Sequence, residues 1–136
     1  MSDLIDSAPI DIVGLEPPSL HAIAYVSTPT VSFSDRDLSD LLLASRRWNA
    51  QYGVTGKLVV LEEEGEIVQF AQWIEGAPAD LEACFARITS DGRHRSLDIR
   101  RQGPVEMRRF PDWDMAIEPV DRDTFEAEAD RLTRDP

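Results

Sequence analysis

The sequence of 136 residues predicts a single α+β domain in which two helices cover one face of a sheet. Two observations support this fold class. Short segments rich in strand-forming residues alternate with longer segments whose apolar residues recur at helical spacing. The order β-α-β-β-α-β-β, followed by a C-terminal helix, is typical of a ferredoxin-like sandwich. A chain of this length can build one hydrophobic core but is too short for two ordinary domains.

The first strand is expected at Leu20–Ser27, where apolar and polar residues alternate (LHAIAYVS). Residues 1–19 precede it and contain three of the nine prolines with little periodicity, so we expect a flexible N-terminal arm. We therefore expect the folded domain to span residues 20–118 and a C-terminal helix to occupy residues 119–136.

The first helix is expected to begin after Ser34, because a serine hydroxyl can accept a hydrogen bond from the first helical turn. Asp35 and Asp37 favour the positive end of the helix dipole, and Gly53 is typical of a helix end. One helical face changes from leucines to small polar groups along its length. Its members are Leu38, Leu41, Leu42, Ser45 and Asn49.

A hairpin is expected next, since two strand-like segments, VTGKLVVLEE and EIVQFAQWIEG, flank Glu64-Gly65. A second helix follows Pro78, with Leu81, Cys84, Phe85 and Ile88 on one face.

The last part of the domain is expected to hold two strands, at Ser96–Arg101 and Val105–Phe110. The segment FPDWDMAI then reads as a turn that enters a last extended piece. Helical spacing of Phe125, Ala129 and Leu132 predicts the C-terminal helix.

Composition excludes several function classes. The net charge of −12 disfavours binding to nucleic acid or to an anionic membrane, whereas a protein partner remains compatible with it. The single cysteine and the two distant histidines give no metal-ligand spacing. No apolar run approaches the roughly 18 residues that span a membrane, and no signal peptide is recognisable, so we expect a cytoplasmic protein.

Gln72 is the most informative polar residue of the predicted strands. Strand alternation places it on one face with Phe70 and Ile74, and an inward amide without partners costs about 1–3 kcal/mol. It is either a core glutamine bonded to backbone or water, or a functional group. Tyr25 belongs to the strand expected beside it, so the tyrosine hydroxyl is a candidate partner.

These residues together resemble the BLUF domain, the blue-light sensor using flavin, in its short stand-alone form. The resemblance covers about residues 20–118. The segments that carry it are YVS with Tyr25, SRRWNAQYGVTG with Ser45 and Asn49, FAQWIEG with Gln72, SDGRHRS with Arg93 and His94, and RRFPDWDMAI with Trp113 and Met115.

The resemblance implies a flavin between the two helices, usually FAD, with FMN or riboflavin as other candidates. Asn49 would donate to a flavin carbonyl and Ser45 would line the ring pocket. Phe70 and Ile88 would pack against the ring. Arg93 and His94 would lie near the edge and tail of the flavin, although the residues alone also fit a solvated basic corner.

The resemblance also implies photochemistry without enzymatic activity. Tyr25 would donate an electron and a proton, relayed through Gln72, and the rearranged amide would form a new hydrogen bond to the flavin. Trp113 and Met115 would relay the signal, although residues of these types in a last strand are also ordinary core. The output would reach an unidentified protein partner or a homo-oligomer.

Two features depart from the family pattern. Trp48 stands before Asn49 where the family usually has a polar or histidine side chain, and the hairpin is longer than usual. They leave open an alternative, a BLUF-like protein-interaction module without flavin. A small ferredoxin-like enzyme is disfavoured because the sequence shows no phosphate-binding glycine loop and no nucleophile with a positioned base.

Overall fold

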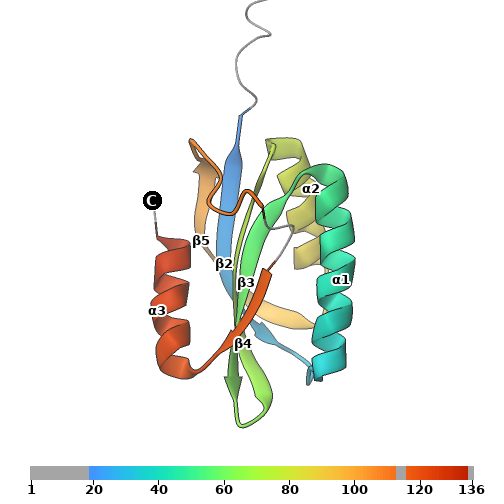
Figure 1. Cartoon of the computed structure of the whole chain (residues 1–136), viewed down its shortest axis with the longest axis vertical. Coiled ribbons are helices and arrows are strands. Elements are labelled where there is room, and N and C mark those ends of the chain that lie inside the picture. Colours follow the sequence, from blue (N-terminus) through green and yellow to red (C-terminus); the bar gives the residue numbers. More distant parts are fainter. Residues whose placement is uncertain (1–18, 113–115, 135–136) are drawn as a thin grey trace, which may run out of the picture.

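The computed structural model describes residues 19–112 and 116–134. The predicted arm, apart from residue 19, and the predicted relay pair Trp113 and Met115 therefore lie outside the described residues. The elements follow the predicted order (Figure 1): β2 (His21–Pro29), α1 (Asp35–Tyr52), β3 (Thr55–Glu63), β4 (Glu66–Gly76), α2 (Pro78–Thr89), β5 (His94–Pro104), β6 (Ala116–Val120) and α3 (Arg122–Thr133).

The strands form one five-stranded sheet in the order β5-β2-β4-β3-β6. β4 lies at its centre, antiparallel to both β2 and β3, and β6 runs parallel to β3. Figure 1 shows α1 and α2 on one side of the sheet and α3 on the other. The α+β, ferredoxin-like fold class predicted from the sequence is confirmed.

The two faces of β4 pack into two separate cores, as strand alternation predicts. Phe70 and Ile74 belong to the core under α1 and α2, together with Leu81. Ala71 and Trp73 belong to the core under α3. The side chains of α3 that complete this second core are Phe125, Ala129 and Leu132. Gln72 consequently lies on the side of the two long helices.

The first helix begins at the predicted capping residue. The Ser34 hydroxyl accepts a hydrogen bond from the Asp37 backbone N–H at 3.1 Å, and the Asp37 carboxylate accepts one from the Ser34 N–H at 3.0 Å. This reciprocal capping box satisfies two backbone donors. Gly53 ends the helix with a φ of 68°, which a residue with a side chain rarely adopts.

The predicted hairpin is also present. Glu64 and Gly65 have φ angles of 54° and 79°, the pair of positive values that a two-residue type I′ turn requires. The β3–β4 register shifts once, between Leu61 and Glu62, and is regular from there to the Thr55↔Glu75 pair. The long hairpin therefore leaves the segment around Gln72 in register with its neighbours.

The predicted strand at Val105–Phe110 is wrong. β5 instead runs to Pro104, and residues 105–112 form bends and turns. The backbone N–H groups of Arg109 and Phe110 donate to the carboxylate of Glu75, at 2.8 and 2.7 Å, instead of to a neighbouring strand. The last strand, β6, lies in the extended piece expected after the turn.

Gly56 is required by the close approach of β3 to β4. A Cβ atom at this position would lie 2.0 Å from the backbone carbonyl oxygen of Trp73. Gly56→Ala is expected to lower the free energy of unfolding by roughly 3 kcal/mol, because backbone must move to admit the methyl group. Urea unfolding of the variant measures this loss. The exposed Gly92 has open space around its Cβ position, so Gly92→Ala is the matched control, and equal losses in both variants would contradict the account.

Candidate functional site

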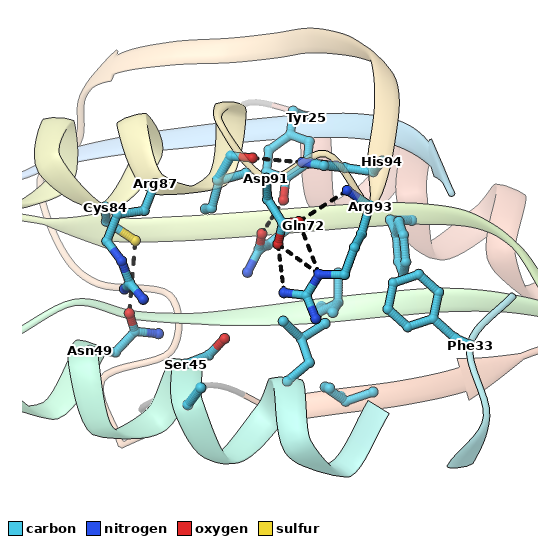
Figure 2. Close-up of a pocket in the computed structure, with 16 residues that line it drawn as sticks. Tyr25, Phe33, Ser45, Asn49, Gln72, Cys84, Arg87, Asp91, Arg93 and His94 are labelled. Atoms are coloured by element: carbon cyan, nitrogen blue, oxygen red, sulfur yellow. Dashed lines mark hydrogen bonds and ion pairs between the residues drawn. The ribbon is translucent and has the colours of Figure 1, made fainter. Parts of the chain in front are cut away.

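A cleft of about 150 Å³ lies between α1 and α2, over the central strands of the sheet. Its walls are apolar side chains from both helices and from β3 and β4, and its polar groups come from β2, β4, α1, α2 and the turn after α2. Figure 2 shows Ser45 and Asn49 projecting from α1 toward the strand that carries Gln72. Such a cleft, mostly apolar with a few converging polar groups, is typical of a site for a small molecule.

Tyr25 and Gln72 form a hydrogen-bonded pair on the floor of the cleft. They are direct cross-strand partners on β2 and β4, and the Tyr25 hydroxyl donates to Oε1 of Gln72. Both side chains are buried, with 3% and 7% of their surface exposed. Burial, followed by the nearby Cys84 and Asp91, raises the pKa of Tyr25 far above its ordinary value. The phenol therefore keeps its proton and remains a hydrogen-bond donor.

The helix α1 contributes two polar groups to the cleft. Ser45 and Asn49 lie one turn apart on the face that continues the leucine stripe, as the spacing predicts. Asn49 is buried, and its Oδ1 accepts a weak hydrogen bond from the thiol of Cys84 on α2 at 3.8 Å. This contact joins the two helices at one end of the cleft.

An ion pair between Asp91 and Arg93 lies at the other end of the cleft (Figure 2). Nη2 of Arg93 is 2.6 Å from Oδ2 of Asp91, and the Arg93 backbone N–H also donates to this carboxylate at 3.0 Å. The Arg93 hydrogen bond holds the pKa of Asp91 below its ordinary value. Arg93 is therefore paired with Asp91 at the cleft, while 48% of its side-chain surface stays exposed.

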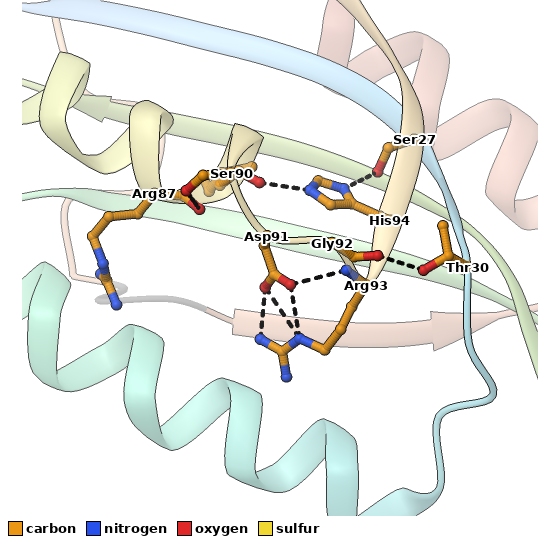
Figure 3. Close-up of polar contacts among 9 residues, drawn as sticks. Ser27, Thr30, Arg87, Ser90, Asp91, Gly92, Arg93 and His94 are labelled. Carbon is orange, nitrogen blue, oxygen red and sulfur yellow. Dashed lines mark hydrogen bonds and ion pairs between the residues drawn. The ribbon is translucent and has the colours of Figure 1, made fainter.

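His94 holds the end of α2 against β2 (Figure 3). Its Nε2 lies 2.7 Å from the carbonyl oxygen of Ile88, and its Nδ1 lies 2.7 Å from the hydroxyl of Ser27. Because a carbonyl oxygen only accepts, Nε2 donates to Ile88, and Nδ1 shares the second hydrogen bond with the Ser27 hydroxyl. These two bonds fix the ring at the wall of the cleft.

Trp48 does not line the cleft. Its ring packs on Tyr52 with the ring centroids 4.4 Å apart, and the guanidinium carbon of Arg87 lies 4.8 Å from its centroid. The structure thus places this bulky residue beside the site and leaves the space between α1 and α2 open.

Cys84 is expected to be unreactive in the folded protein. Burial raises the pKa of its thiol from 9.0 to about 11, so at pH 8 the nucleophilic thiolate is roughly 100-fold scarcer than in the unfolded chain. Iodoacetamide labelling at pH 8, followed by mass spectrometry, should be at least about 100-fold slower in the native protein than in urea. Equal rates would show that the thiol is exposed.

The structure brings together all seven residues predicted to contact a flavin, and Tyr25 lies with them. These are Ser45, Asn49, Phe70, Gln72, Ile88, Arg93 and His94. Two further charged residues of the cleft, Arg87 and Asp91, were missed by sequence analysis. Arg87 follows Cys84 by three residues on α2, a helical spacing that could have indicated it, whereas Asp91 lies in the turn after the helix. Among residues 19–112 and 116–134, no group of His, Cys, Asp or Glu side chains could hold a metal ion.

Comparison with known proteins identifies the family. Residues 20–116 match the family model described as BLUF, sensors of blue-light using FAD. The chain belongs to the BLUF family. The BLUF fold and the recognition made from the sequence are thus confirmed, and the family description is that of a photosensor that uses a flavin. Within the described ranges, no helix has the length and apolar character needed to cross a bilayer.

Segments similar to this chain occur in curated relatives that are much longer than it. Photoactivated adenylate cyclase subunit alpha of Euglena gracilis is 32% identical over 107 residues, which are 77% of this chain and 10% of that protein. Subunit beta of Euglena longa is 28% identical over 96 residues, 70% of this chain and 11% of that protein. The chain thus spans about a tenth of the length of these curated relatives.

The solved structures agree with the sequence relatives. The dark-state structure of the BLUF protein BlrB has a TM-score of 0.70 and 32% identity, and the match covers 86% of this chain and 83% of that one. BlrP1 of Klebsiella pneumoniae, with FMN and cyclic diGMP, has a TM-score of 0.65 and 28% identity, with 83% of this chain and 30% of that chain covered.

Proposed function

We propose that this BLUF protein is a blue-light photoreceptor that binds FAD non-covalently in the cleft between α1 and α2 and passes its signal to a protein partner. The observation that carries the proposal is the buried hydrogen bond from Tyr25 to Gln72 at the floor of the cleft. A tyrosine that keeps its proton lies against an amide whose donor and acceptor ends can exchange places.

The chemistry of the cleft suits a flavin ring. One edge of this flat heteroaromatic ring presents two carbonyl acceptors with an N–H donor between them. The amide of Asn49 and the guanidinium of Arg87 supply donors, and the carboxylate of Asp91 supplies an acceptor. Phe70 and Ile88 supply apolar walls. Arg93 and His94 are proposed to lie near the edge and the tail.

The bound flavin supplies the absorption of blue light and, when excited, an acceptor for an electron. Tyr25 is proposed as the donor of that electron, and its phenolic O–H already donates a hydrogen bond to Oε1 of Gln72. While the electron and the proton leave Tyr25 and then return to it, the amide of Gln72 would exchange its donor and acceptor ends by rotation or tautomerisation. A donor group of Gln72 would then point toward a bound flavin, and the hydrogen bonds of this buried network would change partners.

The output is proposed to be a change of protein contacts. Ser45 would line the ring and Trp113 and Met115 would relay the state of Gln72, a role that the sequence resemblance alone supports. The acidic charge of −12 disfavours contact with nucleic acid or an anionic membrane, and the proposed recipients of the signal are a protein partner or a homo-oligomer. We propose residues 20–118 as the sensor unit and 119–136 as a C-terminal helix; the cytoplasmic location stays a prediction.

The absorption spectrum of the protein, purified in darkness, tests the proposal. A yellow protein whose flavin band moves to longer wavelength under blue light and returns in darkness is expected. Chromatography of the extracted pigment then identifies it as FAD, FMN or riboflavin. A protein that is colourless and stays unchanged after addition of FAD would instead be the flavin-free interaction module.

A further inference from the structure

Glu75 ties the segment after β5 to the central strand. Its side chain is fully buried, and its carboxylate accepts four hydrogen bonds. Oε1 accepts from the indole N–H of Trp73 and the backbone N–H of Arg109, both at 2.8 Å. Oε2 accepts from the hydroxyl of Thr55 at 3.0 Å and the backbone N–H of Phe110 at 2.7 Å. This carboxylate therefore fixes the backbone of Arg109 against β4.

Arg109 in turn caps the C-terminal end of α3. Its guanidinium donates to the backbone carbonyl oxygens of Arg131, Leu132 and Arg134, at 3.2, 3.0 and 2.8 Å respectively. The same guanidinium covers the ring of Trp73, with its central carbon 3.9 Å from the ring centroid. A cation at a helix C-terminus satisfies the last carbonyl groups and the negative end of the dipole.

The helix α3 depends on this cap. It has 12 residues, a length at which an isolated helix is marginal in water. Its C-cap residue, Arg134, has an extended conformation (φ −85°, ψ 151°) in place of the left-handed glycine turn that commonly satisfies the last carbonyls. The last carbonyl groups of α3 therefore rely on Arg109 for their hydrogen bonds.

Gln72 and the two side chains that position Arg109, Trp73 and Glu75, lie on the same strand, β4. Gln72 faces the cleft, and the next residue, Trp73, carries the guanidinium of Arg109 on the opposite face of the sheet. Glu75 follows three positions after Gln72. A shift of β4 at Gln72 therefore moves both groups that position Arg109.

We propose that Arg109 is a positioning residue that couples β4 to the C-terminal end of α3, so that rearrangement of Gln72 loosens the cap and changes the α3 surface offered to a protein partner. The inference rests on the proposed photochemical function of Gln72. The coupling from Gln72 to α3 runs through Trp73, Glu75 and Arg109, on the side of the sheet away from the cleft.

Hydrogen exchange of the full chain, compared in darkness and under continuous blue light, tests this route. In the wild type, light is expected to speed exchange in the last turn of α3 about three- to tenfold, the effect of weakening one hydrogen bond. In Arg109→Ala these amides should exchange fast in darkness and lose their response to light, while the red shift of the flavin band is kept. Arg131→Ala, which removes an equal charge from an exposed position on the same turn, should keep the response.

Either of two outcomes overturns the inference while leaving the photoreceptor proposal intact: a red shift in the wild type without faster exchange in α3, or an Arg109→Ala variant that responds as the wild type does. If Arg109→Ala does not fold, the same hydrogen-exchange comparison is made with Arg109→Lys. Its compact ammonium cannot cover Trp73 and reach three carbonyls together, so an undiminished light response overturns the inference. A wild type without any red shift contradicts the proposed function itself.

Discussion

Replacing Gln72 by leucine is expected to leave the flavin bound and to abolish its light-induced red shift. Leucine fills a similar volume among the apolar neighbours Phe70 and Ile74, but it has no donor to turn toward the flavin. The Tyr25 hydroxyl would lose its acceptor, at a cost of about 1–3 kcal/mol in the free energy of unfolding. Absorption spectra before and after blue light measure the photochemical effect, and urea unfolding measures the stability.

Gln69→Leu is the matched control. Gln69 lies on the opposite face of the same strand and, unlike Gln72, does not line the cleft. Its red shift should equal that of the wild type. A full red shift in Gln72→Leu would show that another residue provides the moving hydrogen bond.

A large loss of stability is expected for Glu75→Gln. Each oxygen of Glu75 accepts two hydrogen bonds, so a glutamine, with only one oxygen, presents its amide N–H₂ group to two donors. The Thr55 hydroxyl can turn away, but an N–H of Trp73, Arg109 or Phe110 is left without an acceptor. The free energy of unfolding should fall by about 2–4 kcal/mol, as measured in urea.

Glu66→Gln, an exposed position on the same strand, removes the same charge and should change the stability by no more than about 0.5 kcal/mol. Equal unfolding midpoints for the two variants would mean that the buried carboxylate of Glu75 adds nothing to the fold.

Local patterns were sufficient to predict most of the architecture. Strand alternation around Gln72 gave the correct inward face, and the capping groups at Ser34 and Gly53 gave both ends of α1. The strand predicted at Val105–Phe110 failed for a non-local reason. Its alternating residues favour an extended conformation, but Glu75, on a distant strand, takes two of its backbone N–H groups. Nothing within residues 105–110 indicates that the Glu75 carboxylate accepts hydrogen bonds from this segment.

The candidate site was also predicted only in part from the sequence. The pairing of Tyr25 with Gln72 followed from the strand order, because the first strand runs beside the second strand of the hairpin. Asp91 was missed because an acidic residue in a polar turn resembles a solvated group until its ion pair with Arg93 is seen. Glu75 was missed for a related reason, since a glutamate before a glycine at a strand end is usually exposed.

The infrared difference spectrum between the illuminated and dark states tests the central claim most directly, because it reports hydrogen bonding at the flavin carbonyl. The account predicts that a flavin carbonyl band moves to lower frequency under blue light in the wild type and does not move in Gln72→Leu. A red-shifted visible band with an unmoved carbonyl band in the wild type would contradict the claim that Gln72 forms a new hydrogen bond to the flavin.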